Sequence, residues 1–171
     1  MKIVLVGYMG CGKSSVGSFI AKKMQIIHYD LDAEIEQFTQ LSTSELFETK
    51  GEIYFRKVEN QVLKVLLAKS ESYILSLGGG TPCYYNNYEL LQQNDVTSFY
   101  LKGSVATLVK RLSNETTKRP LLSKLNPAEL TDFINKHLFD RSFYYHQVNF
   151  VINIDDKSVN EVALAIAEKL T

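Results

Sequence analysis

The 171-residue sequence has little of what marks secreted, membrane or nucleic-acid-binding proteins. It contains only two cysteines, Cys11 and Cys83, which lie far apart and show no metal-ligand spacing, so we expect reduced thiols in a cytoplasmic protein. The apolar run near the N-terminus covers only residues 3–6, so we expect neither a signal peptide nor a membrane span. Nineteen basic residues balance nineteen acidic ones, which gives no support to nucleic acid or a membrane surface as a partner.

Internal repeats, low-complexity tracts and linkers rich in proline or glycine are also missing. The composition is 45% hydrophobic and 22% charged, as in folded soluble proteins, and the length suits one domain with a full core. We therefore expect a single domain over residues 1–171. Because no long exposed apolar helix is evident, we expect this domain to act as a monomer.

Short apolar runs alternate with helix-like segments, a pattern typical of a parallel sheet covered by helices. The expected strands are residues 2–6, 26–29, 73–77, 97–101 and 150–154, and the expected helices are 13–24, 33–38, 42–51, 52–68, 88–93, 105–112, 127–145 and 159–170. The helical stretch between the second and third strands is longer than a crossover needs. It therefore suggests a substrate-binding insertion over about residues 33–61.

Local patterns predict how two of these helices begin, end and face the sheet. Ser42 and Glu45 have the spacing of a capping box, and Gly51 is expected to end the helix that they begin. The side of the first helix that faces the sheet is expected to carry Val16, Phe19, Ile20 and Met24, which follow helical periodicity.

The first expected strand runs directly into a glycine-rich loop, Gly7-Tyr8-Met9-Gly10-Cys11-Gly12-Lys13-Ser14, which fits the phosphate-binding pattern G-x-x-x-x-G-K-[ST]. A helix follows, so backbone N–H groups and the positive helix end would face a polyphosphate. Lys13 would reach the β- and γ-phosphates, and the Ser14 hydroxyl would bind Mg²⁺. The alternative is a chance match in a glycine-rich turn, but both flanking elements are those that the motif requires.

Asp30 and Asp32 follow the second strand, at the sheet edge where the phosphate loop also begins. These carboxylates could hold Mg²⁺ through water and accept a proton from a substrate hydroxyl. The alternative is that one of them only caps the next helix, and Asp32 could do both.

Gly78, Gly79 and Gly80 follow the third strand, where three glycines suggest close approach to a ligand or, alternatively, a plain turn.

Three arginines are further candidates. Arg56 lies three residues before Glu59, a spacing that predicts an ion pair on one helix face and, taken alone, an ordinary surface pair. Arg119 lies in a polar stretch that could close over a nucleotide and bring a guanidinium to the transferred phosphoryl group. Arg141, near a helix end, taken alone predicts a solvated charge. The Tyr84-Tyr85 and Tyr144-Tyr145 pairs are interpreted as packing, and the Cys11 thiol as incidental.

Together these features resemble the shikimate kinase family, over nearly the whole chain. The matching blocks are Gly7 to Ser15 with Val16-Gly17, Asp30-x-Asp32 with Ala33-x-Ile35-Glu36, Phe55-Arg56-x-x-Glu59, Leu77-Gly78-Gly79-Gly80, Arg119-Pro120-Leu121-Leu122 and Arg141-x-x-x-Tyr145. The six blocks occur in the order and spacing of that family. The resemblance implies transfer of the γ-phosphoryl group of ATP to the 3-hydroxyl of shikimate, with Mg²⁺ as cofactor.

The resemblance also implies an architecture and a role for each candidate. The fold would be a three-layer α/β/α P-loop kinase of nucleoside-monophosphate-kinase type, with five parallel strands in the order 2-3-1-4-5 and a lid at about residues 113–126. ATP would contact Gly10, Cys11, Gly12, Lys13, Ser14, Ser15, Arg111, Arg119 and Asp156; shikimate would contact Asp32, Arg56, Gly78, Gly79, Gly80 and Arg141; Mg²⁺ would contact Ser14 and Asp30; and Lys13, Asp32 and Arg119 would be catalytic.

Two alternatives remain open from the sequence. One is another small-molecule kinase of the same fold, such as a gluconate kinase, which gives no obvious reason for two arginines from separate segments. The other is a nucleotide-binding regulatory module without turnover, in which a damaged catalytic set would be expected. Lys13, Asp32 and Arg119 are all present, which favours an enzyme.

Overall fold

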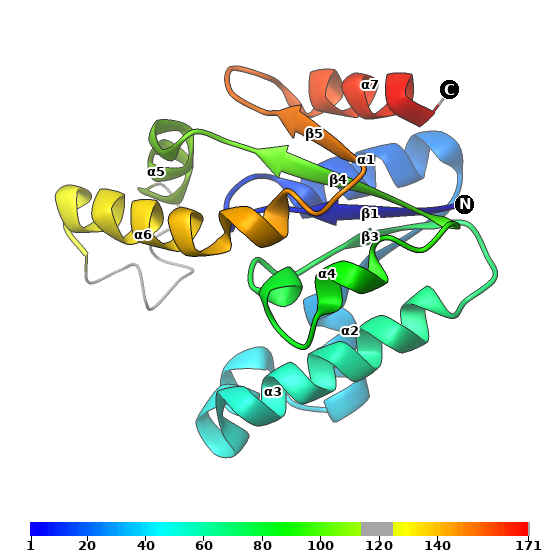
Figure 1. Cartoon of the computed structure of the whole chain (residues 1–171), viewed down its shortest axis with the longest axis horizontal. Helices are drawn as coiled ribbons and strands as arrows, with labels where there is room; N and C mark the ends of the chain where they lie inside the picture. The colour runs from blue at the N-terminus through cyan, green and yellow to red at the C-terminus, as the bar shows by residue number, and fades with distance from the viewer. Residues whose placement is uncertain (114–124, 171) are drawn as a thin grey trace.

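The computed structural model describes residues 1–113 and 125–170, and its centre is a five-stranded parallel sheet (Figure 1). The strands are β1 (Lys2–Val6), β2 (Ile27–Asp30), β3 (Tyr73–Ser76), β4 (Val96–Lys102) and β5 (Phe150–Asn153). Their order is β2-β3-β1-β4-β5, and every pair of neighbours is parallel. The predicted sheet and strand order are therefore confirmed.

Helices connect and cover the strands. They are α1 (Lys13–Met24), α2 (Leu31–Thr39), α3 (Thr43–Leu67), α4 (Asn87–Leu90), α5 (Val105–Ser113), α6 (Pro127–Tyr145) and α7 (Val159–Leu170), with a 3-10 turn η1 (Thr81–Cys83) after β3. Figure 1 shows α1 and α7 close together near β5, α5 beside α6, and α2 with α3 at the other end of the molecule. The loops that follow the carboxyl ends of the strands lie between these helices, at one edge of the sheet.

The core is built around the middle strand. In β1, Ile3, Val4, Leu5 and Val6 are completely buried, as expected for a parallel strand with helices on both faces. Lys2 is also buried, and its ammonium group donates to the backbone oxygen of Leu67 and pairs with Asp95. The loop that follows β1 is therefore anchored to a buried strand in the middle of the sheet.

The first helix begins and ends where the sequence predicts, but one of its predicted inward residues is wrong. Val16 and Ile20 are buried and Phe19 packs against the core, whereas Met24 is 37% exposed. Met24 lies in the last helical turn, where the chain leaves the helix at Gln25 (φ 56°) and turns toward β2. Helical periodicity does not show that the last turn of the helix is exposed.

The local predictions for α3 are confirmed. Ser42 is the N-cap and forms a reciprocal capping box with Glu45. The helix is interrupted at Gly51, which has φ 79° and ψ 170°. Phe55, Val58, Val62, Leu63 and Leu66 are buried along one side of the second half.

Across the described ranges 1–113 and 125–170, no helix combines the length and apolar character that crossing a membrane requires.

The kink at Gly51 gives a prediction about stability. Its backbone conformation is accessible almost only to glycine, and placing another residue there costs about 1–3 kcal/mol. A Cβ at this position would meet no described atom within 4 Å, so the cost comes from the backbone alone. We expect Gly51→Ala to lower the free energy of unfolding in urea by about 2 kcal/mol.

The matched control is Lys50→Ala, an exposed helical position next to the kink. It should change the free energy of unfolding by less than about 0.5 kcal/mol. Equal effects of the two substitutions would contradict the assignment of backbone strain to Gly51.

Candidate active site

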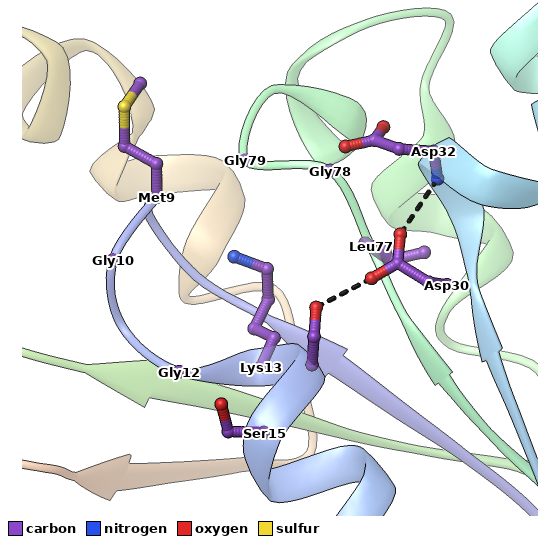
Figure 2. A pocket seen from close by; sticks show the side chains of 11 residues that line it. Met9, Gly10, Gly12, Lys13, Ser15, Asp30, Asp32, Leu77, Gly78 and Gly79 are labelled. Atoms are coloured by element: carbon purple, nitrogen blue, oxygen red, sulfur yellow. Dashed lines mark hydrogen bonds between the residues drawn. The ribbon is translucent and has the colours of Figure 1, made fainter. Parts of the chain in front are cut away.

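The carboxyl ends of β1, β2 and β3 meet around one polar pocket (Figure 2). The loop after β1, the start of α2 after β2 and the glycines after β3 supply its walls. The lining residues are Met9, Gly10, Gly12, Lys13, Ser14, Ser15, Asp30, Asp32, Leu77, Gly78 and Gly79. The structure therefore brings together most of the residues that the sequence selects from three separate segments.

The phosphate loop has the backbone that its glycines predict. Gly10 and Gly12 have φ values of 77° and 95°, in the left-handed region that residues with a Cβ rarely adopt. Gly12 is also the N-cap of α1, so the free N–H groups of the first helical turn face the loop. This arrangement suits an anion of several oxygens.

The Lys13 side chain folds back onto the phosphate loop and is held there by hydrogen bonds. Its Nζ donates to the backbone oxygens of Gly7 (2.7 Å) and Tyr8 (3.1 Å). Figure 2 shows its ammonium group facing the pocket between Gly10 and Gly79. A bound phosphate would find this cation already at the loop, with no long movement of the side chain.

Ser14 and Asp30 meet at the base of the pocket. The Ser14 hydroxyl donates to Asp30 Oδ2 at 2.6 Å. Asp30 Oδ1 accepts from the backbone N–H of Asp32, and Asp30 is the N-cap of α2. The prediction that one of the two aspartates caps this helix is therefore confirmed for Asp30 and wrong for Asp32, because the helix begins at Leu31, two residues earlier than the sequence suggests.

The Ser14–Asp30 pair is chemically suitable for Mg²⁺. Its oxygens are hard ligands, and protein-bound Mg²⁺ commonly takes one or two protein oxygens and completes its shell with water and phosphate oxygens. In the described part of the chain, no cluster of three or more acidic, histidine or cysteine side chains could hold a metal by itself. A metal here would therefore depend on the phosphates bound beside it.

Asp32 points into the pocket from the first turn of α2 (Figure 2). A Cβ on Gly78 would come within 3.1 Å of Asp32 Oδ1. Asp32 as a whole residue is exposed. Its carboxyl group, however, lies against the glycine turn and is less hydrated than the rest of the residue. The absence of a side chain at position 78 is what allows this contact.

The surroundings of Asp32 favour its protonated form. Burial of its carboxyl group, then the negative charges of Asp30 and Glu59, raise the pKa of Asp32 to about 6. Lys13 and Arg56 act in the opposite direction. A carboxyl group with this pKa is ionised at neutral pH and titrates close to it, as suits a group that exchanges a proton with a substrate.

Arg56 and Glu59 form a buried pair, so the interpretation as an ordinary surface pair is wrong. Glu59 is completely buried, the Arg56 side chain is 12% exposed, and Arg56 Nη1 donates to Glu59 Oε2 at 2.9 Å. The Arg56 guanidinium also lies over the Tyr84 ring, 4.1 Å from its centroid. The kinked α3 packs against η1, which buries the pair where sequence spacing predicts only helix surface.

Arg141 reaches the same glycine segment from α6. Its Nη1 donates to the backbone oxygen of Gly79 (3.4 Å), which also accepts from the Tyr145 hydroxyl. A Cβ on Gly80 would lie 2.7 Å from Arg56 Nη2, and a Cβ on Gly79 would lie 3.8 Å from Arg141 Nη1, so both guanidinium groups lie close to this glycine segment. Arg141 is partly buried, and the prediction of a solvated charge is wrong.

A second pocket lies on the opposite side of the phosphate loop. Its lining residues are Gly10, Cys11, Gly12, Ser15, Val16, Arg111, Ile154, Lys157, Val159 and Val162. Arg111 Nη1 donates to the backbone oxygen of Cys11 at 3.2 Å, while the Cys11 residue is 2% exposed. Asp156 is in the adjoining loop but does not line this pocket, whereas Lys157 does.

Sequence reasoning missed some residues and selected others that lie outside the described structure. Arg119 and most of the predicted lid fall on residues 114–124, outside the described ranges. The prediction that Tyr145 packs is confirmed, because it is completely buried in the core, but its hydroxyl also donates to the Gly79 carbonyl, and the Tyr84 ring lies against the Arg56 guanidinium. Tyr145 does stand in the block Arg141-x-x-x-Tyr145 of the family resemblance, whereas for Tyr84 the available signal is its closeness in sequence to Gly80.

The sequence as a whole is similar to shikimate kinases. A family model described as shikimate kinase matches residues 9–171. A shikimate kinase from Flavobacterium johnsoniae is 48% identical over 169 residues, which are 99% of this chain and 98% of the relative. One from Flavobacterium psychrophilum is 53% identical over 157 residues, which are 92% and 91% of the two chains.

Solved structures of shikimate kinases are also similar to this chain. The shikimate kinase of Bacteroides thetaiotaomicron superposes with a TM-score of 0.91 at 31% identity, covering 99% of this chain and 98% of its own. The Acinetobacter baumannii enzyme, solved in complex with shikimate, has a TM-score of 0.86 at 30% identity, with 99% and 92% covered. A deoxyadenosine kinase from M. mycoides, at 21% identity and TM-score 0.61 over 99% of each chain, shares the fold.

The charges around Asp32 give a prediction that needs no substrate. We expect a carbon-13 NMR titration of the free protein to give a pKa of about 6 for Asp32. Asp30→Asn removes a negative neighbour and should lower the pKa of Asp32, whereas Arg56→Met removes a positive one and should raise it. Shifts in the same direction, or a starting value near 3.8, would contradict this electrostatic account.

The same pKa has a consequence for stability. The folded chain keeps the Asp32 proton up to about pH 6, whereas the carboxyl group has an ordinary pKa of 3.8. The folded state therefore binds more protons than the unfolded state between these values. The contribution of Asp32 to the free energy of unfolding falls as the pH rises through this window.

Proposed function

Because the chain belongs to the shikimate kinase family, we propose that it transfers the γ-phosphoryl group of ATP to the 3-hydroxyl of shikimate, giving shikimate 3-phosphate and ADP. One observation carries the proposal. Arg56 from α3 and Arg141 from α6 approach the same glycine segment, which lies between Asp32 and the phosphate loop. That set suits an acceptor that is small, anionic and hydroxylated.

The acceptor carboxylate is assigned to the two arginines. A guanidinium group can bind a carboxylate through two parallel hydrogen bonds. The ion pair with Glu59 fixes one edge of Arg56, and the Tyr84 ring covers a face of its guanidinium group. In this proposal the backbone N–H of Gly79 also binds shikimate, and Gly78 and Gly80 leave room for the ring because they carry no side chain.

The donor phosphates are assigned to the loop. Gly10, Cys11, Gly12, Lys13, Ser14 and Ser15 would bind ATP through their backbone N–H groups, the Lys13 ammonium group and the hydroxyls. Ser14 and Asp30 would hold Mg²⁺, which neutralises phosphate charge when it is bound. Arg111 and Asp156 would lie beside the adenosine part, and Arg119 would contact the phosphates from the lid at about residues 113–126.

The proton of the acceptor hydroxyl is assigned to Asp32. As the shikimate oxygen bonds to the γ-phosphorus, the bond from that phosphorus to the β,γ-bridging oxygen breaks, and the hydroxyl proton passes to the Asp32 carboxylate. Lys13 and Arg119 would stabilise the negative charge on the transferred group. Phosphoryl transfer depends mainly on positioning and charge, and the residues at this sheet edge would supply both.

In this proposal the chain acts as one kinase domain and as a monomer, the state expected from a sequence in which no long exposed apolar helix is evident. Residues of about 33–61 form the substrate-binding insertion in this proposal, since Arg56 lies there. The predicted compartment is the cytoplasm.

A coupled assay of ADP release tests the proposed function against its alternatives. We expect ADP release that depends on shikimate, with neither gluconate nor omission of an acceptor supporting it. Release with gluconate alone would point to a different small-molecule kinase. No release with any acceptor, together with normal ATP binding, would identify a regulatory module.

The role of Asp32 gives a second test. We expect Asp32→Asn to lower kcat about 100-fold or more, in the range of general-base catalysis, while KM for ATP stays within about twofold. The control is Asp132→Asn, an exposed position on α6, which should leave both constants unchanged. Near-normal turnover by Asp32→Asn would rule out the carboxylate as a necessary proton acceptor.

A further inference from the structure

A connected group of buried polar side chains lies behind Arg56 and has no part in the mechanism above. Asn60, Thr81 and Asn87 are nearly or completely buried, although each carries a polar side chain. They come from α3, η1 and α4. Buried polar groups of this kind are retained only where they are hydrogen-bonded.

Thr81 connects this group to the arginine. Its hydroxyl donates to Glu59 Oε1 at 2.6 Å, while Glu59 Oε2 accepts from Arg56 Nη1 at 2.9 Å. Each carboxylate oxygen of Glu59 therefore has one partner, and the two bonds together fix the rotation of the carboxyl group. The edge that Glu59 presents to Arg56 is thus set by Thr81.

Thr81 is itself fixed by a chain of hydrogen bonds through the other two buried polar residues. Asn87 Nδ2 donates to the backbone oxygen of Thr81 at 2.9 Å, and Asn60 Nδ2 donates to Asn87 Oδ1 at 2.7 Å. The chain reaches Asn87 through Tyr85 and Asn86, which have φ values of 50° and 53°. Two successive non-glycine residues in the left-handed region persist only where surrounding contacts hold them, and Asn87 supplies such contacts.

The glycine segment leaves room for the Thr81 contact. A Cβ on Gly78 would lie 2.9 Å from Thr81 Oγ1 and 3.3 Å from Glu59 Oε1. The hydrogen bond between threonine and glutamate therefore passes directly under the turn that lines the pocket. A substitution of Thr81 would therefore disturb the acceptor side of the site, where Glu59 and Gly78 lie, more than the phosphate loop.

We propose that Thr81, held by Asn87 and Asn60, is a positioning residue that fixes the Glu59 carboxylate and, through it, the orientation of the Arg56 guanidinium toward the acceptor's carboxylate. The inference rests on the proposed function, because it assigns Arg56 to that carboxylate. Removing the Thr81 hydroxyl would leave one oxygen of a buried carboxylate without its donor. The Glu59 carboxyl group could then rotate, and its hydrogen bond would no longer fix the orientation of the Arg56 guanidinium group.

The test compares Thr81→Val, which replaces the hydroxyl with a methyl group, and Thr81→Ser, which keeps it. We expect Thr81→Val to raise KM for shikimate about tenfold, the size of one lost hydrogen bond to a charged group. KM for ATP should stay within about twofold and kcat within about threefold. Thr81→Ser should restore KM for shikimate to within about twofold of the unaltered protein.

The matched control is Thr39→Val, a partly buried threonine whose hydroxyl also donates to protein atoms, at the far end of α2. It should leave KM for shikimate unchanged. If Thr81→Val does not fold, Thr81→Ala removes the same hydroxyl without adding a methyl group and decides the question by the same constants.

Two results would overturn the inference: an unchanged KM for shikimate in Thr81→Val, or an equal rise of KM for shikimate and for ATP that Thr81→Ser does not correct. Failure of the proposed function is distinguishable from both. It would appear as an unaltered protein that does not use shikimate, or as normal KM for shikimate in Arg56→Ala. A protein that uses shikimate through Arg56 and gives either of the two results above contradicts the positioning role of Thr81 alone.

Discussion

The close approach of backbone and side chains at Gly78–Gly80 is the constraint on which the site depends. A Cβ at Gly78 would meet Asp32, Glu59 and Thr81, and a Cβ at Gly80 would collide with the Arg56 guanidinium. A Cβ at Gly79 would lie 3.4 Å from the backbone nitrogen of Met9 in the phosphate loop. Neither Gly78 nor Gly80 has a positive φ, so space, and not backbone conformation, is what requires glycine there. Three segments far apart in sequence can meet because this turn carries no side chains.

Charges of both signs are gathered around that turn before any ligand is present. The carboxylates of Asp30, Asp32 and Glu59 lie near the cations of Lys13 and Arg56. The internal pairs keep most of these charges in place, as Ser14 does for Asp30. Asp32 differs, because the charges that raise its pKa exceed those that lower it. A site arranged in this way needs little reorganisation when phosphates and a carboxylate enter.

Much of this could be predicted from sequence where the cause is local. The phosphate loop, the capping box at Ser42 and the kink at Gly51 follow from residue type and spacing, and the strand order followed from the family resemblance. The predictions failed where tertiary packing decides: Met24 is 37% exposed at the end of α1 although it follows the helical period, and the spacing of Arg56 and Glu59 cannot show that η1 buries the pair. Thr81 gave no signal, because a threonine before proline is ordinary in a turn.

The strand order explains why one loop can serve two pockets. β1 lies in the middle of the sheet, with β3 on one side and β4 on the other, so the chain leaves β1 at the point where the connections diverge, the usual ligand position in open α/β sheets. Gly10, Gly12 and Ser15 line both pockets. The pocket toward β2 and β3 carries the carboxylates and the glycine turn, while the pocket toward β5 and α7 carries Arg111 and Lys157. In the proposed function, a polyphosphate on the loop has its nucleoside on the second side and its acceptor on the first, and the transferred group lies at the wall that the two pockets share.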